Sequence, residues 1–208
     1  MPKLGKKSKS TLRITGGMLK NKAVSSRKDP NLRPTTAKNR ETMFTLLAHG
    51  RFFSHEAYIE CKDRPLLQDA HVLDLFCGTG ILGFEALSRG AASAIFVDQN
   101  ADTLQVAREN AQIIGVAEQC HFMRKSSTNL PVARQPVDIV FMDPPYDQQL
   151  ATAALRNMQD NGWLQHGTLI LLEQGKRDAI PERSEFKVLD QRHNDKTMLC
   201  VLQYNDSY

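Results

Sequence analysis

Short apolar runs alternate along this chain with stretches in which apolar residues recur every three or four positions. The runs predict buried strands near residues 71–76, 94–98, 120–124, 137–142, 168–173, 186–190 and 197–204. The helical spacing predicts helices at 81–89, 101–114 and 148–160, and a further helix that begins at Ala37. Strands that alternate with helices are typical of an α/β fold with a mostly parallel sheet. Because only a short polar turn separates the last two strands, we expect a terminal hairpin and one antiparallel strand in a seven-stranded sheet.

A shorter pattern precedes the first of these helices. Apolar residues from Leu12 to Val24 flank Gly16-Gly17 and predict a short β-hairpin. A chain of 208 residues is long enough for one well-buried domain with a modest extension. We therefore expect an N-terminal extension at residues 1–34 and a single α/β domain at residues 35–208. Residues 49–70 form a long link before the first central strand, and their pattern indicates no function.

The segment from Val72 to Leu87 has the pattern of a buried strand, a tight glycine turn and the start of a helix. Gly78 and Gly80 have no Cβ, so the backbone there can adopt unusual dihedral angles and approach a ligand closely. The spacing of Gly78, Gly80 and Gly83 fits the dinucleotide-binding pattern as well as a site for S-adenosylmethionine (SAM). The glycines alone therefore leave NAD and SAM both open.

Two acidic residues at strand ends bear on this choice. Asp74, just before the glycines, would repel a pyrophosphate but suits the ammonium group of a methionine moiety. Its alternative role is to cap the turn by accepting bonds from backbone amides. Asp98 ends the next strand, where a carboxylate can accept both hydroxyls of an adenosine ribose, unless it is merely a solvated strand-end acid. The residues predicted to contact the cofactor are Asp74, Phe76, Cys77, Gly78, Thr79, Gly80, Asp98, Gln99 and Ser126.

The strand predicted at 137–142 runs directly into Asp143-Pro144-Pro145-Tyr146. Two consecutive prolines fix the backbone and remove two amide donors, so the strand must end there. Asp143 then lies at the carboxyl edge of the sheet, which is where open α/β sheets bind their ligands. We therefore expect Asp143, Pro144, Pro145 and Tyr146 to form the catalytic group.

These motifs resemble those of a known class of enzymes. Asp-Pro-Pro-Tyr at the end of the fourth predicted strand is similar to the signature of SAM-dependent enzymes that methylate exocyclic or amide nitrogens. The segments RITGGMLKNK, LRPTT and NRETMF resemble the N-terminal region of the bacterial family that methylates N2 of one guanine in small-subunit (16S) ribosomal RNA. The resemblance implies a Rossmann-like methyltransferase fold, SAM as the cofactor, and ribosomal RNA or the small ribosomal subunit as the partner. At Ser126, relatives often carry an Asp or Asn that binds the adenine amino group, a bond that a serine hydroxyl can also accept.

The Asp-Pro-Pro-Tyr segment suggests how such a reaction would proceed. The Asp143 carboxylate and the Pro144 carbonyl would accept hydrogen bonds from the two N–H groups of the target amine. These bonds would aim the lone pair of the amine at the methyl group. Asp143 is also the expected proton acceptor. Pro145 would keep the turn rigid. Tyr146 would stack on a base drawn out of its helix or loop, unless it is a packed core tyrosine.

Basic residues are concentrated near the N-terminus. Residues 1–40 hold 12 of the 27 Lys and Arg residues and one of the 23 acidic residues, a net charge of +11, whereas the other 168 residues carry −7. A basic arm on an acidic body is suited to binding a polyanion, although residues 1–10 alone would also serve as a solubilising tail. The predicted RNA contacts are Arg13, Lys20, Lys22, Arg33 and Arg40.

Composition narrows the class of protein further. The hydrophobic content of 41% is ordinary, and no apolar run has the length of a transmembrane helix or the pattern of a signal peptide. The four cysteines are scattered, without a CxxC pair or a neighbouring histidine cluster. We therefore expect reduced thiols, no metal site and a cytoplasmic location. We also expect a monomer.

Other functions are compatible with parts of the pattern. A methyltransferase for DNA adenine or for a glutamine amide would use the same Asp143 geometry, but the chain is short for a separate DNA-recognition domain and its basic arm argues against a protein substrate. A ribosome-assembly factor without catalysis would not need Asp74, Asp98 and Asp143 together. An NAD-dependent oxidoreductase is disfavoured by Asp74 and has no use for the Asp-Pro-Pro-Tyr segment.

Overall fold

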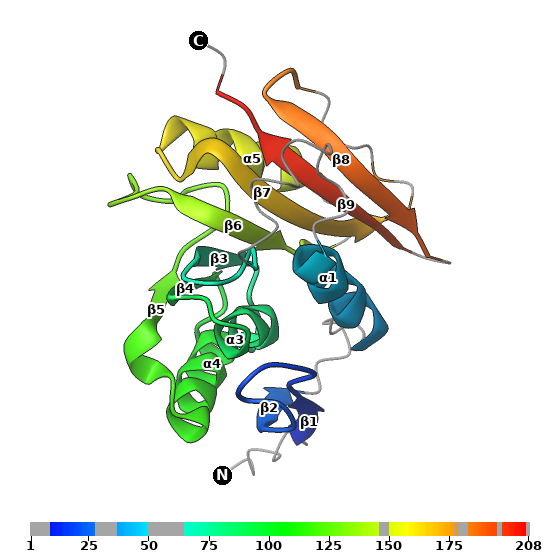
Figure 1. Cartoon of the computed structure of the whole chain (residues 1–208). Helices are drawn as coiled ribbons and strands as arrows, with labels where there is room; N and C mark the ends of the chain where they lie inside the picture. The colour runs from blue at the N-terminus through cyan, green and yellow to red at the C-terminus, as the bar shows by residue number, and fades with distance from the viewer. Residues whose placement is uncertain are drawn as a thin grey trace.

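The structure is a computed structural model that describes residues 9–27, 37–49, 65–145, 150–176, 178, 183–194 and 197–206. Its centre is a seven-stranded sheet with strand order β5-β4-β3-β6-β7-β9-β8 (Figure 1). The strands are β3 (His71–Leu75), β4 (Ser93–Asp98), β5 (Cys120–Arg124), β6 (Val137–Met142), β7 (Leu164–Gly175), β8 (Phe186–His193) and β9 (Thr197–Tyr204). Strands β3 to β7 pair in parallel, and β9 pairs antiparallel with both β7 and β8. The predicted α/β fold with one antiparallel strand is confirmed.

Helices cover both faces of this sheet. Helices α1 (Ala37–His49), α3 (Ile81–Ser88) and α4 (Ala101–Ile114) lie on one face, and α5 (Leu150–Asp160) lies on the other (Figure 1). Within β3, Val72 packs toward α1, α3 and α4, whereas Leu73 and Leu75 pack toward α5. This two-sided burial explains why the central strands are continuous apolar runs in the sequence. In the described part of the chain, no helix combines the length and the apolar character needed to cross a bilayer.

Local hydrogen bonds fix the ends of α4. The Asn100 side chain caps its start by accepting bonds from the backbone N–H groups of Asp102 and Thr103. Gly115 ends the helix with φ 82°, a left-handed conformation that suits a residue without Cβ. The short 3₁₀ helix η1 (Ala117–Gln119) then leads into β5. Helix α5 is predicted to begin at residue 148, but residues 146–149 lie outside the described residues.

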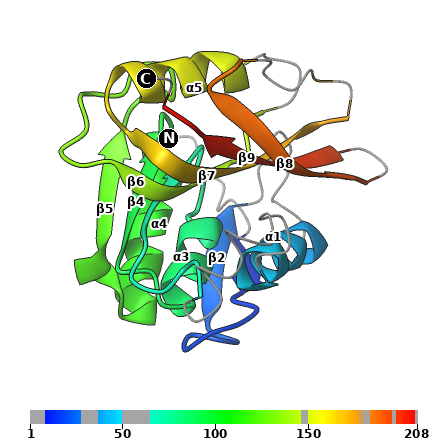
Figure 2. The same ribbon diagram turned by 45° about the horizontal axis from the view of Figure 1, so that its top comes forward.

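The predicted N-terminal hairpin is present, because β1 (Lys9–Arg13) pairs antiparallel with β2 (Ala23–Arg27). Ile14 and Val24 are buried and join the core beneath α1, α3 and α4, beside which the hairpin lies (Figure 2). The hairpin loop docks on the end of α3, where the Ser88 hydroxyl donates to the Gly16 carbonyl at 2.5 Å. Gly17 has φ 78°, and a Cβ there would collide with the Ser88 backbone, so the loop requires glycine at this position. The predicted domain boundary at residue 34 falls within 28–36, outside the described residues.

Candidate active site

The carboxyl ends of three neighbouring strands bring the main predicted site residues to one edge of the sheet. Leu75 of β3 pairs with Val97 of β4 and with Met142 of β6. The residue after Leu75 begins the glycine loop. Asp98 follows Val97, and Asp143 follows Met142. Because the three strands are parallel and in this register, these residues lie side by side at the carboxyl edge of the sheet.

The loop after β3 reverses direction through three residues with positive φ. Phe76 has φ 67°, Gly78 has φ 53° and Gly80 has φ 84°. The Cys77 N–H donates to the Val97 carbonyl at 3.0 Å, and the Gly80 N–H donates to the Cys77 carbonyl at 2.8 Å. Positive φ is uncommon for a phenylalanine and persists only where the surrounding structure imposes it. The loop is therefore held in one shape at the carboxyl edge.

The glycines of this loop serve different purposes. A Cβ on Gly83 would collide with the Phe96 ring, and one on Gly80 would lie 2.8 Å from the Phe84 ring, so both glycines allow close packing of α3. A Cβ on Gly78 would meet no described atom within 4 Å. The backbone at Gly78 therefore borders open space that a ligand can approach, which fits the cofactor that the motif predicts.

Asp98 connects the glycine loop to the start of α4. Its Oδ2 atom accepts the Gly78 N–H at 2.8 Å, and its Oδ1 atom accepts the Asn100 N–H at 2.8 Å. Each carboxylate oxygen has capacity for a second donor, and the side chain is only partly buried. Asp98 can therefore hold the loop and still accept ribose hydroxyls. Gln99, the next candidate, is exposed beside it.

Asp74 is buried, with 2% of its surface exposed. Its Oδ2 atom accepts the Gly83 N–H at 2.9 Å, so the alternative role of capping the turn is present in the structure. Burial raises the pKa of Asp74 to about 7, the Gly83 hydrogen bond opposes this rise, and the Asp98 carboxylate adds to it. Contact with a cofactor ammonium group is compatible with this environment and stays a prediction.

Two further cofactor candidates are small residues near the same edge. The Cys77 thiol is buried, and burial, assisted by Asp74 and Asp98, raises its pKa well above the usual value. It is therefore a neutral, space-filling group and not a nucleophile. Ser126 follows β5, and its hydroxyl oxygen lies 3.0 Å from that of Thr128, which fixes the turn but leaves the adenine contact a prediction.

Asn110 of α4 is a residue of this region that the sequence analysis missed. Its buried side chain donates from Nδ2 to the Thr79 carbonyl at 3.2 Å and to the Ser25 carbonyl at 3.0 Å. Its Oδ1 atom accepts the Ser25 N–H at 2.9 Å. Asn110 thus ties strand β2 of the hairpin to the glycine loop. The available signal was a polar residue on the apolar face of a helix, between Ala107 and Ile114.

The predicted catalytic group begins where β6 ends. The strand stops at Met142, as the two prolines predict. Asp143 is partly buried, Pro144 is buried and Pro145 is exposed. Tyr146 lies outside the described residues, so its stacking on a base stays a prediction.

Three of the predicted RNA contacts lie on the surface of the hairpin. The side chains of Arg13, Lys20 and Lys22 are exposed, and the Lys22 ammonium also donates to the Ile114 carbonyl at 2.8 Å. Arg33 lies outside the described residues. The exposed charges are therefore available to a polyanion on the same side of the sheet as α3 and α4.

The predicted RNA contact at Arg40 is contradicted by its burial. Its exposed fraction is 2%, and its Nε atom lies 3.7 Å from a carboxylate oxygen of the buried Glu85. Burial lowers the pKa of Arg40, and the Glu85 carboxylate opposes this change. Glu85 also accepts bonds from Thr15 and Arg89. Arg40 therefore helps to join α1 and the hairpin to α3 and does not present its charge to RNA.

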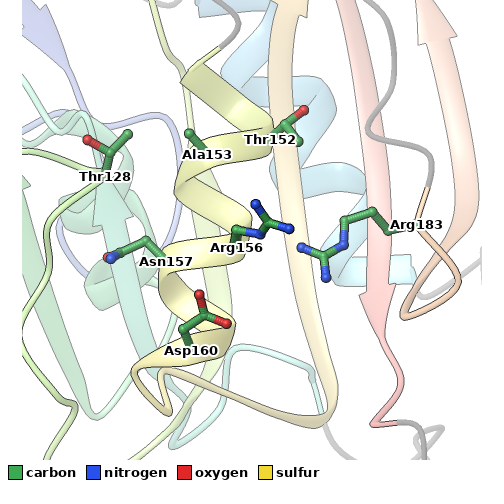
Figure 3. Close-up of a pocket in the computed structure, with 7 residues that line it drawn as sticks. All are labelled: Thr128, Thr152, Ala153, Arg156, Asn157, Asp160 and Arg183. Carbon is green, nitrogen blue, oxygen red and sulfur yellow. The ribbon is translucent and has the colours of Figure 1, made fainter.

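A separate depression of about 620 Å³ lies along the outer side of α5 (Figure 3). The guanidinium groups of Arg156 and Arg183 point toward one another there. Arg183 is paired with Glu185 at 2.9 Å, and Asp160 lines the same depression, so its charge is mixed. The lining residues are Thr128, Thr152, Ala153, Arg156, Asn157, Asp160 and Arg183, and the predicted site residues are not among them. We assign this depression no role.

Comparisons with known proteins agree with this geometry. The chain is similar to "Ribosomal RNA small subunit methyltransferase D" of Escherichia coli (strain K12), with 32% identity over 170 residues that cover 82% of this chain and 78% of the relative. The solved structure of a putative methyltransferase, yhhF, from Escherichia coli matches with a TM-score of 0.80 and 27% identity, over 95% of this chain and 100% of that chain. An RNA methyltransferase from Salinibacter ruber in complex with S-adenosyl-L-homocysteine shares the fold, with a TM-score of 0.55 and 16% identity, over 75% of this chain and 95% of that chain.

A family profile adds the last observation. It matches residues 12–203, which include most of the hairpin, the glycine loop and the Asp-Pro-Pro-Tyr segment. The resemblance identified from the sequence motifs is thereby confirmed, and the fold is that of SAM-dependent methyltransferases. This chain belongs to the family described as conserved hypothetical protein 95.

Proposed function

We propose that this protein transfers a methyl group from SAM to the exocyclic N2 of a guanine in small-subunit ribosomal RNA. The observation that carries the proposal is the convergence of the glycine loop, Asp98 and Asp143 at the carboxyl edge of three adjacent strands. This arrangement supports a cofactor site beside a site for an amine-bearing group. The printed name of the Escherichia coli relative supports ribosomal RNA as the substrate class.

The residues around the glycine loop fit the cofactor. Asp98 would accept the ribose hydroxyls, and Gly78 would allow close approach of the backbone. Asp74 would face the ammonium group, and Ser126 would accept a bond from the adenine amine. When bound, SAM supplies a methyl group attached to a positively charged sulfur.

The residues after β6 would hold the acceptor. The N2 lone pair of guanine is delocalised into the ring, so the amine must be oriented before it can react. The Asp143 carboxylate and the Pro144 carbonyl would accept hydrogen bonds from its two N–H groups. Asp143 would take the proton that the amine loses. Pro145, which lacks an N–H, would keep this turn rigid. Tyr146 would stack on the base after it leaves its helix or loop.

Exposed basic residues would supply affinity for RNA. Arg13, Lys20 and Lys22 lie on the hairpin, which is docked on α3 and α4. Contacts from such residues to phosphates give affinity without sequence preference. The choice of base would then be made in the pocket beside Asp143.

Asp143→Ala tests the proposal directly. With labelled SAM and 16S ribosomal RNA or small subunits, we expect methyl transfer to fall by about 100-fold or more, since both orientation and proton acceptance are lost. Binding of SAM, measured by calorimetry, should persist. Asp138→Asn is the matched control, because Asp138 lies near the opposite end of β6, where it accepts the His71 N–H. It should retain transfer.

Two results would overturn the proposal. One is wild-type transfer by Asp143→Ala at saturating SAM and RNA. The other is transfer by the native protein to DNA or to protein in place of ribosomal RNA, with the modified atom identified by mass spectrometry.

A further inference from the structure

A buried acid on β7 lies next to the predicted catalytic residue. Leu172 of β7 pairs with Met142 of β6, and the next residues on the two strands are Glu173 and Asp143. Parallel neighbours are separated by about 4.8 Å, so Glu173, two residues before β7 ends at Gly175, lies beside Asp143, the first residue after β6. Glu173 has an exposed fraction of 2% and was not among the residues predicted from the sequence.

The side chain of Glu173 lies on the face of the sheet that carries α1 and α3. Leu171 packs on this face and Leu172 on the opposite one, so strand alternation returns Glu173 to the α1 side. The contact with α1 agrees, because Asn39 Nδ2 donates to Glu173 Oε1 at 2.5 Å. Asp74 is on this face too, since it accepts a bond from Gly83 of α3. The acid therefore borders the region between Asp143 and α1.

A polar cluster fixes the orientation of this carboxylate. Asn39 also donates to the Thr197 hydroxyl at 3.4 Å and accepts a bond from the Asn194 amide at 2.7 Å. Asn39 is thus held by β9 and by the turn before it, and it directs its own N–H toward Glu173. A carboxylate has about four lone-pair sites, so a base N–H can add to the interactions that Glu173 makes within the protein.

Guanine presents two kinds of donor on one edge. Its N2 amine and its N1–H lie side by side and point in similar directions, whereas adenine has an acceptor at N1. A site that holds the amine through Asp143 therefore needs a second acceptor on the adjacent position to read N1–H. An enzyme that draws a base out of its helix reads it by such hydrogen bonds to this edge. Glu173 is the acid in that adjacent position.

We infer that Glu173 accepts the N1–H of the target guanine and is a specificity-determining residue for the base. This inference rests on the proposed function and explains how the proposed acceptor site selects guanine. A bond between a base N–H and a carboxylate discriminates because an N1 acceptor would face the Glu173 oxygens without a proton between them.

Glu173→Gln separates this role from a structural one. The Asn39 N–H should keep the carbonyl oxygen of the new amide on its own side, so the tether to α1 survives. The amide N–H₂ then faces the base. It repels guanine N1–H but suits the N1 acceptor of 2-aminopurine, which retains the C2 amine. The two bases differ in this way while both keep the reacting nitrogen.

The experiment uses the full chain and ribosomal RNA in which the methylated guanosine, located first with the native protein, is replaced by 2-aminopurine riboside. The native protein should prefer guanine to 2-aminopurine by about 10-fold to 150-fold, the range expected for one hydrogen bond to a charged group. Glu173→Gln should lose or reverse this preference through slower transfer to guanine. SAM affinity and the thermal unfolding midpoint should stay unchanged.

Asn39→Ala is the comparison variant, because it removes the tether and keeps the carboxylate. It should lower the overall rate but preserve the ratio of guanine to 2-aminopurine transfer. An unchanged ratio in Glu173→Gln, or an equal loss of the ratio in Asn39→Ala, overturns the inference while the proposed function stands. Absence of transfer to ribosomal RNA by the native protein overturns both.

Discussion

At Asp74, a carboxylic acid is held where water does not reach it. Its hydrogen bond with the Gly83 N–H stabilises the charged form, but burial dominates and raises the pKa to about 7. The unfolded chain has no such burial, so its Asp74 titrates near the ordinary value of 3.8. Between these values, the folded protein binds the proton and the unfolded chain does not. This difference makes the stability of the fold depend on pH.

We predict that the free energy of unfolding falls as the pH rises from about 4 to about 7, because the folded state must give up a proton that the unfolded chain has already lost. Above about pH 7 both states are ionised and the contribution is constant. Asp74→Asn can still accept the Gly83 N–H, and its free energy of unfolding should depend less on pH between about 4 and 7. Urea unfolding at a series of pH values measures this free energy. The signal is the fluorescence of Trp163, the single tryptophan. Identical curves for the two proteins would contradict the prediction.

At this scale the sequence predicted which residues reach the site better than what each of them contacts. The strand ends identified Asp74 and Asp98, because parallel strands bring their carboxyl ends together. The bond from Gly83 to Asp74 depends on the path of a loop with three positive φ values, one of them at Phe76. Sequence pattern does not encode such a path. Glu173 carried a usable signal, since a Glu inside the apolar run of β7 is rarely buried without a polar partner. Asn39 is such a partner in the structure.

At the scale of elements, the hairpin is docked on α3 through Glu85. This buried carboxylate accepts bonds from the Thr15 N–H at 2.9 Å and the Thr15 hydroxyl at 3.0 Å, and it is paired with Arg89 and Arg40. The hairpin, α1 and α3 thus converge on one acid. Removing one member of a buried ionic cluster leaves the opposite charges without compensation.

We predict that Glu85→Ala lowers the free energy of unfolding by about 3 to 5 kcal/mol, since the buried Arg40 and the partly buried Arg89 would both lose the Glu85 carboxylate. Urea unfolding of the full chain measures this change. Arg192→Ala is the comparison variant, because the Arg192 side chain is exposed and its pair with the half-buried Asp190 should contribute less than about 1 kcal/mol. Similar losses in the two variants would show that the Glu85 cluster does not anchor the hairpin.

The same scale shows where element prediction succeeds and where it stops. The buried central strands are visible as apolar runs, and each of the seven predicted strands is present in the sheet. Strand β7 begins at Leu164 and not at 168, because the polar residues Gln165 and His166 conceal its first part from a pattern search. Arg40 lies three and four positions before Met43 and Phe44, on the buried face of α1. Its helical position was readable, but its acidic partner on α3 follows only from the tertiary fold.

At the scale of the whole molecule, charge and packing are combined in one extension. The first 40 residues carry +11 and the rest −7, yet Ile14 and Val24 of the hairpin also complete the core. Asn110 further ties the hairpin to the glycine loop. Deleting the extension would therefore open the core and disturb the glycine loop along with any RNA contact. A test of the RNA role must remove charge and leave the backbone in place.

Replacing Arg13, Lys20 and Lys22 with alanine removes three exposed charges without touching Ile14 or Val24. We predict that the variant binds 16S ribosomal RNA more weakly and that the logarithm of its affinity falls less steeply with the logarithm of salt concentration. If each side chain contacts one phosphate, the slope should decrease by about 2 to 3, because each contact releases counterions. Filter binding over a series of KCl concentrations measures the slope.

Alanine at Arg156, Lys187 and Arg192 makes the same change in net charge on the α/β domain, where all three side chains are exposed. An equal change of slope in both variants would show that total charge, and not the hairpin, provides the attraction; a change confined to the first would place the RNA backbone on the surface beside the glycine loop.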